Sequence, residues 1–328
     1  MAKKVSKIGV MTSGGDSPGM NAAIRAVVRA CTYYQVKCIG FYRGYEGIIE
    51  HDCIELTSRG VKNIINKGGT ILKSARSEEF RSFEGRTKAY QNLKAEGIDA
   101  LVLIGGDGTF TGGALFSKEF DIPVIGIPGT IDNDIYGTQF TIGYDTALNT
   151  VVDAVDKIRD TASSHNRLFF IEVMGRDAGF IALNSGVGAG AEEILIPEED
   201  QPLEKLIESL QRSKKNGKTS SIVIVAEGDK TGKNVFELAE YVKENLEDYS
   251  PRVTVLGHLQ RGGSPTCFDR VLASRLGVRA VELLLEGEQD VMVGIRNNMV
   301  VSTPIVEIMR CKNSVNKELL RIADILSI

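Results

Sequence analysis

The sequence lacks the features that mark several large classes of protein. Its 328 residues carry 39 lysines and arginines against 43 aspartates and glutamates, a formal net charge of −4, so no broad basic face for nucleic acid is indicated. No segment approaches the ~20 consecutive apolar residues that cross a bilayer. The first eleven residues hold three lysines but no apolar stretch of signal-peptide length. We therefore expect a cytoplasmic protein that binds neither nucleic acid nor membranes.

The cysteines do not form a disulfide framework. Five are present, an odd number, and no two have the CxxC spacing of a redox or zinc motif. We interpret them as free thiols in a reducing compartment.

The sequence also shows no linker that would separate two domains. No low-complexity segment and no repeat of 20–50 residues divides the chain, although its length is enough for about two domains of ~150 residues. We therefore expect a chain that passes between its domains more than once.

What the sequence does have is an alternation of apolar strands with helix-like segments. Short β-rich runs predict strands at residues 7–11, 36–42, 100–104, 124–127, 168–173, 222–226 and 253–256. Apolar residues at helical spacing predict a helix over residues 20–34. Strand, loop and helix in alternation favour an α/β fold with mostly parallel sheets covered by helices.

The loop after the first predicted strand, residues 12–21 (TSGGDSPGMN), has the composition of an anion site. Its glycines let a ligand approach the backbone, and Pro18 suits the first turn of the following helix. Free N–H groups at that helix start favour phosphate. A plain tight turn accounts for the same residues, so this loop alone leaves both interpretations open.

A second loop, residues 105–109 (GGDGT), again follows a strand and is followed by two further glycines. Paired glycines make a backbone cradle for phosphate, but Asp107 would repel a bare phosphate. Mg²⁺ between the carboxylate and the phosphates removes this conflict, because Mg²⁺ favours one or two carboxylates plus substrate oxygens. We therefore expect Mg²⁺ as cofactor. Neither loop matches GxxxxGK[ST] or a clean GxGxxG.

A third loop, residues 128–134 (PGTIDND), carries two acids. In an extended segment Asp132 and Asp134 share one side. One acid can hold a metal while the other takes a proton from an attacking hydroxyl. An Asx-rich turn is the alternative interpretation.

These three loops, together with residues 172–176 (EVMGR) and 256–265 (LGHLQRGGSP), resemble the signature segments of the bacterial ATP-dependent 6-phosphofructokinases. The segments occur in the family's order, and the resemblance spans essentially the whole chain. GGDG alone is shared with NAD kinases and lipid kinases, whereas PGTIDND together with GHLQRGG is specific.

The resemblance implies two Rossmann-like three-layer domains with the active site in the cleft between them. It implies an ATP-binding domain at residues 1–143 plus 260–310 and a sugar-phosphate-binding domain at residues 144–259 plus 311–328. The implied glycolytic reaction transfers the γ-phosphoryl group of MgATP to the 1-hydroxyl of fructose 6-phosphate, giving fructose 1,6-bisphosphate and ADP.

The resemblance also assigns residues. ATP-binding positions of the family correspond to Gly15, Tyr45, Arg76, Ser77, Arg81, Gly106, Asp107, Gly108, Thr109 and Gly112. Asp132 corresponds to the general base, and the catalytic set is Gly15, Thr130, Asp132 and Arg176. The Mg²⁺ carboxylates correspond to Asp107 and Asp134. Sugar-phosphate positions correspond to Thr130, Asp132, Asp134, Arg167, Met174, Gly175, Arg176, Glu227, Arg252, His258 and Arg261. Arginines suit a phosphomonoester because they bind it in bidentate fashion.

Assembly, control and donor choice follow from the same resemblance. In the family the counterparts of Arg167 and Arg252 reach in from a neighbouring subunit, which implies a homotetramer. Pyrophosphate-using relatives usually have aspartate and lysine where Gly108 and Gly129 stand, which indicates ATP as donor. An ADP or phosphoenolpyruvate effector site corresponds to Arg25, Arg29, Arg59, Arg159, Gly190, Glu192 and Lys218.

Two departures from the family's effector site bear on that control. Ser58 and Asn216 stand where arginine and lysine are common. Two fewer cations weaken phosphate binding, so we hypothesise blunted allostery.

Three other functions compete with this one. An NAD kinase explains residues 105–109 but leaves residues 128–134 and the arginines unexplained. A Rossmann oxidoreductase needs a GxGxxG turn that the first loop lacks. A non-catalytic sensor with the same fold conflicts with the apparently complete sets of acids and arginines.

Overall fold

The computed structural model describes residues 5–165, 167–200, 202–217, 221–246 and 249–327. These residues form two compact units. The first unit contains the residues up to Ile131, Ile135–Thr146 and Arg261–Asn313, and the second contains Asp132–Asp134, Ala147–Gln260 and the residues from Ser314 onward. The chain therefore enters each unit more than once.

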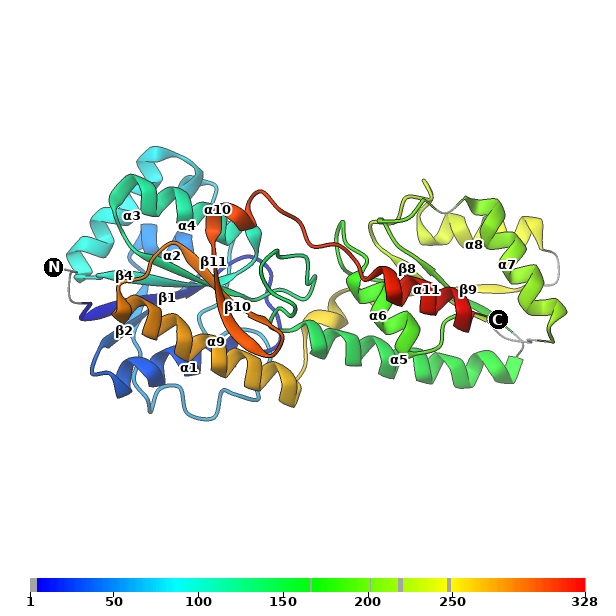
Figure 1. Ribbon diagram of the computed structural model, residues 1–328, viewed down its shortest axis with the longest axis horizontal. Helices are drawn as coiled ribbons and strands as arrows, with labels where there is room; N and C mark the ends of the chain where they lie inside the picture. Colours follow the sequence, from blue (N-terminus) through cyan, green and yellow to red (C-terminus); the bar gives the residue numbers. More distant parts are fainter. Residues whose placement is uncertain (1–4, 166, 201, 218–220, 247–248, 328) are drawn as a thin grey trace. The chain divides into compact units, whose positions relative to one another are not determined.

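The first unit is built on a seven-stranded sheet in the order β11-β10-β5-β4-β1-β2-β3 (Figure 1). At the two ends of the sheet, β3 pairs antiparallel with β2 and β11 pairs antiparallel with β10. Every other pairing is parallel. The strands are β1 (Lys7–Thr12), β2 (Lys37–Phe41), β3 (Cys53–Glu55), β4 (Ala100–Gly105), β5 (Val124–Pro128), β10 (Val291–Arg296) and β11 (Met299–Pro304).

Helices cover both faces of this sheet, and the pleat of the strands explains how. In β4, Val102 packs into a core with α1 (Met20–Tyr33) and α9 (Cys267–Glu286). Leu101 and Leu103 point to the opposite face, as alternate residues of a strand must. There they pack with α2 (Tyr45–Glu50), α3 (Phe83–Glu96), α4 (Asp107–Phe120) and α10 (Ile305–Ile308). The short 3-10 helix η1 (Glu79–Arg81) contacts α2 and α3.

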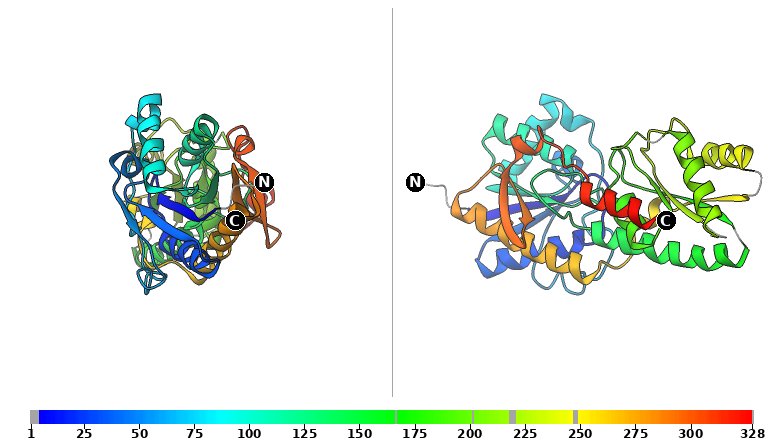
Figure 2. Two further views of the ribbon diagram at one scale, coloured as in Figure 1. Left: turned by 90° about the vertical axis from the view of Figure 1, so that its left-hand side faces the viewer. Right: turned by 45° about the vertical axis from the view of Figure 1, so that its right-hand side comes forward.

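The second unit is built on a four-stranded, fully parallel sheet in the order β7-β8-β6-β9. Its strands are β6 (Leu168–Val173), β7 (Glu193–Leu195), β8 (Ser221–Ala226) and β9 (Pro251–Val255). One face packs against α7 (Leu203–Lys215) and α8 (Val235–Asn245). Helix α6 (Phe180–Gly188) contacts β8 and α11 (Lys317–Leu326), the red helix in Figure 2. Helix α5 (Tyr144–His165) and the 3-10 helix η2 (Gly257–Arg261) have most of their residues in this unit.

The predicted α/β fold with mostly parallel sheets is confirmed. All seven predicted strands and the predicted helix are present, with ends that differ by at most two residues. Across the part of the chain that the structure describes, no helix is both long and apolar enough to cross a membrane. Since the carboxyl ends of parallel strands gather at one edge of a sheet, the loops after β1, β4 and β5 share an edge, and so do those after β6, β8 and β9.

Candidate active site

In the loop after β1, Arg261 lies directly over Gly15. A Cβ atom added to Gly15 would meet Arg261 Nη1 at 2.0 Å, and the same nitrogen donates to the carbonyl oxygen of Asp16 at 3.3 Å. Helix α1 begins just beyond, after Gly19 (φ 109°), and no described side chain caps its first N–H groups. The structure thus brings together two predicted site residues at a helix start that suits an anion.

The loop after β4 presents two glycines that protein packing does not require. No described atom lies within 4 Å of a Cβ built on Gly106 or Gly108, and neither residue has a positive φ. Gly105 is different, because a Cβ there would lie 2.4 Å from Thr109 Oγ1. Asp107 is exposed at the first position of α4. Open backbone at a helix N-terminus is what a phosphate-binding loop needs.

Tyr45 lies beneath this loop rather than on its surface. Its hydroxyl donates to the carbonyl oxygen of Thr109 at 2.5 Å, and its ring stacks on Phe80 with centroids 3.9 Å apart. A Cβ on Gly112 would lie 3.1 Å from the ring. Only 6% of Tyr45 is exposed, and burial raises the pKa of its hydroxyl. Tyr45 therefore supports Thr109 and Gly112 from below as a protonated donor, and its predicted contact with ATP stays a prediction.

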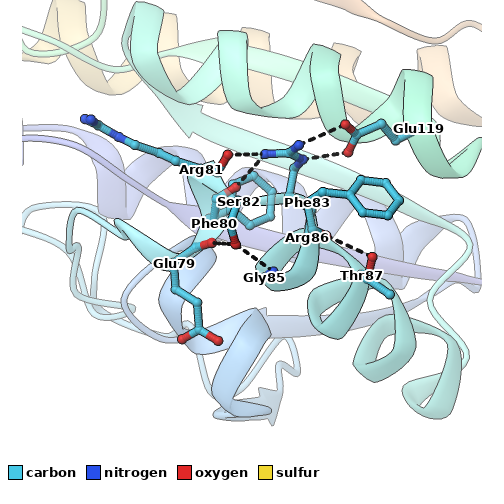
Figure 3. Close-up of polar contacts among 9 residues, drawn as sticks. All are labelled: Glu79, Phe80, Arg81, Ser82, Phe83, Gly85, Arg86, Thr87 and Glu119. Carbon is cyan, nitrogen blue, oxygen red and sulfur yellow. Dashed lines mark hydrogen bonds and ion pairs between the residues drawn. The ribbon is translucent and has the colours of Figure 1, made fainter.

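Arg81, another predicted ATP residue, stands on a segment that is held by an arginine we did not predict. Arg86 Nη1 donates to the carbonyl oxygens of Phe80 and Arg81 at 3.0 and 2.6 Å (Figure 3). Its other nitrogens form a bidentate pair with Glu119 at 2.6 and 2.9 Å. Arg86 is buried, whereas Arg76 and Arg81 are exposed. The arginine-rich segment was visible in the sequence, but residue type alone does not separate a buried guanidinium from solvated ones.

The loop after β5 places its acids differently from our expectation. Asp132 is buried and Asp134 is half-buried. Asn133 between them has φ 55°, the left-handed conformation, so the segment is not extended. The extended segment that our inference assumed is therefore wrong, and the argument that places the two acids on one side no longer applies. Thr130 is fixed nearby by a hydrogen bond from Thr141 Oγ1 to its carbonyl oxygen at 2.6 Å.

Within the second unit, the buried carboxylate of Asp132 meets a guanidinium. Arg176 Nε lies 3.9 Å from Asp132 Oδ2. Arg176 follows β6 with φ 55°, and Glu227 holds this turn because its Oε1 accepts from the N–H groups of Gly175 and Arg176 at 3.2 and 2.7 Å. A Cβ on Gly228 would lie 2.1 Å from the Arg176 carbonyl oxygen. The carboxyl ends of β6 and β8 thus bring together four residues of the predicted site.

Gln260 is a further residue of this region that the sequence did not single out. It is fully buried, its Oε1 accepts from the N–H of Met174 at 3.2 Å, and its Nε2 donates to the carbonyl oxygen of Gly257 at 3.0 Å. It therefore ties the end of β6 to the turn that carries the exposed His258. The one signal that could have found it is its place inside the signature segment 256–265.

The structure does not place Arg167 and Arg252 with Arg176. Arg167 directly precedes β6, and Arg252 is opposite Phe169 near the start of β9. Met174, in contrast, follows the other end of β6. Since β6 has six residues, its ends are about 17–20 Å apart. The two arginines therefore lie at the opposite edge of the sheet from Arg176.

Comparison with known proteins identifies the family to which this chain belongs. The phosphofructokinase family model matches residues 7–284. The chain belongs to the phosphofructokinase family. It is 55% identical over 324 residues to ATP-dependent 6-phosphofructokinase 2 of Bacteroides thetaiotaomicron, covering 99% of both chains. It is 54% identical over 324 residues to ATP-dependent 6-phosphofructokinase 1 of Thermus thermophilus, covering 99% of this chain and 100% of the other. The resemblance expected from the sequence is confirmed.

Solved phosphofructokinase structures share the fold. The phosphofructokinase from Saccharomyces cerevisiae superposes with a TM-score of 0.89 at 38% identity, covering 93% of this chain and 45% of that longer chain. The pyrophosphate-dependent phosphofructokinase from Marinobacter aquaeolei gives a TM-score of 0.85 at 22% identity, covering 96% of this chain and 86% of that chain, which shows the fold alone.

In this phosphofructokinase chain, the residues predicted for the effector are found in both units. In the first unit, one surface pocket of about 540 Å³ is lined by Arg29, Thr32, Tyr33, Ser58, Arg59 and Lys62. Arg25 lies one turn before Arg29 on α1, and partial burial together with the charge of Arg29 lowers its pKa. Lys62 is a cation of this pocket that we did not predict.

In the second unit, Arg159 joins the other predicted effector residues. Its Nη2 donates to the carbonyl oxygens of Ala189 and Gly190 at 2.6 and 2.8 Å, and its Nη1 lies 3.9 Å from Glu192 Oε1. Lys218 lies outside the described residues.

Proposed function

We propose that this chain is an ATP-dependent 6-phosphofructokinase. It transfers the γ-phosphoryl group of MgATP to the 1-hydroxyl of fructose 6-phosphate and gives fructose 1,6-bisphosphate and ADP, a step of glycolysis in the cytoplasm. The observation that carries this proposal is the 52–55% identity to proteins of that name over nearly the full length of both chains.

Two glycines support ATP rather than pyrophosphate as the donor. A Cβ at position 108 would meet no described atom within 4 Å, so packing within the protein does not require glycine there. The glycine leaves space for a bound ligand. A Cβ at position 129 would lie 3.1 Å from Ile104 Cγ2 and 3.2 Å from Met20 Cε. A lysine at 129 would have to displace both side chains, whereas the glycine fits.

We assign Asp132 as the general base. Its carboxylate takes the proton of the acceptor hydroxyl while the hydroxyl oxygen bonds to the γ-phosphorus, and the bond from that phosphorus to the β–γ bridging oxygen breaks to release ADP. Arg176 offsets the negative charge that spreads over the transferring oxygens. General base catalysis typically contributes ~10²–10⁴-fold in rate, and most of the remaining acceleration must come from positioning and charge.

The carboxylates of Asp107 and Asp134 suit Mg²⁺. Both are hard oxygen ligands, and both have accessible surface, Asp107 beside the open backbone of Gly106 and Gly108. When bound, Mg²⁺ neutralises charge on the donor phosphates.

Arg167 and Arg252 support a shared acceptor site in an oligomer. Both lie about 17–20 Å along the strands from Arg176, at the opposite edge of the sheet, which favours their use in a different acceptor site from that of Arg176 in the same chain. We therefore assign these two arginines to the 6-phosphate of a neighbouring copy, in a homotetramer. The pocket around Arg29 and Arg59 is the proposed place for ADP or phosphoenolpyruvate as effector.

A purified-protein assay tests this function directly. Fructose 6-phosphate is offered with ATP or with pyrophosphate, each with and without Mg²⁺, and product is measured by coupled enzymes. NAD replaces fructose 6-phosphate as acceptor in a parallel reaction. We expect turnover with ATP, fructose 6-phosphate and Mg²⁺ together. Faster turnover with pyrophosphate, or phosphorylation of NAD instead of the sugar, would contradict the proposal.

A further inference from the structure

His51, Cys53 and Glu96 form a cluster of three different metal-ligating side chains in the first unit. One ligand atom from each lies within 4.8 Å of the other two. His51 Nε2 is 3.4 Å from Glu96 Oε2. The side chains of His51 and Glu96 are 41% and 28% exposed, and Cys53 is half-buried. None of the three has a role in the reaction proposed above.

The backbone around this cluster is fixed by the fold. His51 ends α2 in the left-handed conformation (φ 58°), which turns the chain so that Cys53 begins β3 opposite Phe41. Asn92 on α3 donates to the carbonyl oxygens at the end of α2, those of Ile48 and Ile49, at 3.0 and 2.8 Å. The ends of α2 and α3 are therefore tied together before any ion binds, and this preorganisation lowers the cost of binding.

The electrostatics of this corner favour a cation. Glu96 is the last residue of α3, whose C-terminus carries partial negative charge. Lys7 already interacts with this negative charge, because its Nζ donates to the Glu96 carbonyl oxygen at 2.5 Å and lies 3.4 Å from Glu96 Oε1. The other carboxylate oxygen, Oε2, faces His51.

We propose that His51, Cys53 and Glu96 bind Zn²⁺ or a similar borderline-soft divalent cation, with water as the fourth ligand. Thiolate, imidazole and carboxylate are the ligand types of zinc, whereas Mg²⁺ and Ca²⁺ bind oxygen. Binding forms a metal–sulfur bond and releases the thiol proton to solvent.

The distances agree with a tetrahedral site. Zinc bonds of about 2.0–2.3 Å place tetrahedral ligand atoms about 3.3–3.7 Å apart. The His51–Glu96 pair at 3.4 Å already has that separation. The remaining ligand separations reach at most 4.8 Å, so the side chains need to close by about 1 Å at most when the ion binds. Lys7 then remains on Glu96 Oε1 and orients the carboxylate, as hydrogen-bond partners of metal ligands do.

Cobalt spectroscopy tests this site on the full-length protein. The protein is reduced, freed of metal with a chelator and titrated with Co²⁺ under argon. We expect one equivalent to produce a near-ultraviolet thiolate-to-cobalt charge-transfer band with intense visible bands of tetrahedral Co²⁺, and one equivalent of Zn²⁺ to remove them. The matched variants are Cys53→Ser and His51→Gln, with Cys311→Ser as control because Cys311 is an exposed free thiol elsewhere.

The variants decide the outcome. We expect Cys53→Ser to abolish the charge-transfer band, His51→Gln to weaken Co²⁺ binding at least about tenfold, and Cys311→Ser to leave both unchanged. Circular dichroism establishes that each variant is folded. The proposal is overturned if the parent shows no band, if the band survives Cys53→Ser, or if His51→Gln, at an exposed position, leaves the binding unchanged.

Discussion

Arg176 Nε lies 3.9 Å from Asp132 Oδ2, and the two side chains differ greatly in exposure. Asp132 is 4% exposed and Arg176 is 61% exposed. The backbone of Arg176 is held by Glu227, so its guanidinium extends toward solvent from a fixed turn. This pairing of a buried carboxylate with an accessible cation suits the two proposed roles, a base for the acceptor hydroxyl and a cation that offsets charge on the transferring phosphoryl group.

Replacing Arg176 by alanine tests the charge-stabilising role. A hydrogen bond to a charged group contributes about 1.5–3 kcal/mol, so we expect kcat/KM to fall by about 10–150-fold. Steady-state kinetics with both substrates varied measures it. Arg321→Ala, at an exposed position of the same unit, serves as control and should change little. A loss of less than about threefold in Arg176→Ala would count against the assignment.

Arg86 stabilises the fold around the predicted ATP residue Arg81. Its side chain is 7% exposed and pairs with Glu119. Removing one partner of a buried pair typically costs about 3–5 kcal/mol, so we expect Arg86→Ala to lower the free energy of unfolding by about that amount. Urea denaturation measures the change. The exposed pair of Lys88 with Glu79, at 3.5 Å, is the control, and Lys88→Ala should cost no more than about 1 kcal/mol. Equal costs for the two variants would be inconsistent with this role.

Asp269 links the starts of α5 and α9 in the first unit. It is fully buried and accepts from the N–H of Gly143 at 2.9 Å and from the N–H and hydroxyl of Thr146 at 2.8 and 2.5 Å. Thr266 completes the link, because its Oγ1 accepts from the N–H of Asp269 and donates to Asp145. Burial raises the pKa of Asp269 from 3.8 to about 6 despite these donors.

The raised pKa of Asp269 predicts a pH dependence with a definite sign. Between the unfolded value near 3.8 and the folded value near 6 the native state binds more protons, so this group adds stability as the pH falls through 6. Asp269→Asn removes the titration. From pH 7 to pH 5 we expect the parent to gain on the order of 1 kcal/mol of unfolding free energy relative to the variant. A parent that loses stability relative to the variant on acidification would refute this account.

Ser58 lines the proposed effector pocket together with Arg29, Arg59 and Lys62. We expect ADP and phosphoenolpyruvate to shift the fructose 6-phosphate saturation curve only weakly, because an arginine common in the family is absent at position 58. Ser58→Arg should strengthen the effector's apparent affinity by about tenfold or more, as a new hydrogen bond between charged groups would. Saturation curves at several effector concentrations measure this.

The control adds the same charge elsewhere. Gln91→Arg places an arginine on the exposed side of α3 and should not change the response. A strong sigmoidal shift in the parent protein, or an unchanged response in Ser58→Arg, would remove the hypothesis of blunted control.

The parts that the sequence predicted correctly are those with a local signal. The strand at Ala100–Gly105 is apolar throughout because it is buried on both faces. β3 and β7 have three residues each, too few for any period to show. The candidate catalytic loops could be predicted because glycines and acids follow strands directly.

The parts that it missed depend on contacts between distant residues. Gly15 and Arg261 are far apart in the chain. Only the fold shows that the guanidinium of Arg261 occupies the space that a side chain at position 15 would need. Buried Arg86, Gln260 and Asp269 have the same residue types as solvated neighbours, so sequence alone did not single them out. The left-handed Asn133 could not be predicted from the spacing of the acids around it.

The kcat of Asp132→Asn with MgATP and fructose 6-phosphate tests the central claim, that the carboxylate at position 132 takes the proton of the acceptor hydroxyl. The amide keeps the shape of the side chain but cannot accept that proton at neutral pH. We predict a fall in kcat of ~10²–10⁴-fold, with the KM for fructose 6-phosphate within about threefold of the parent. A variant that turns over at nearly the parent rate would contradict the account.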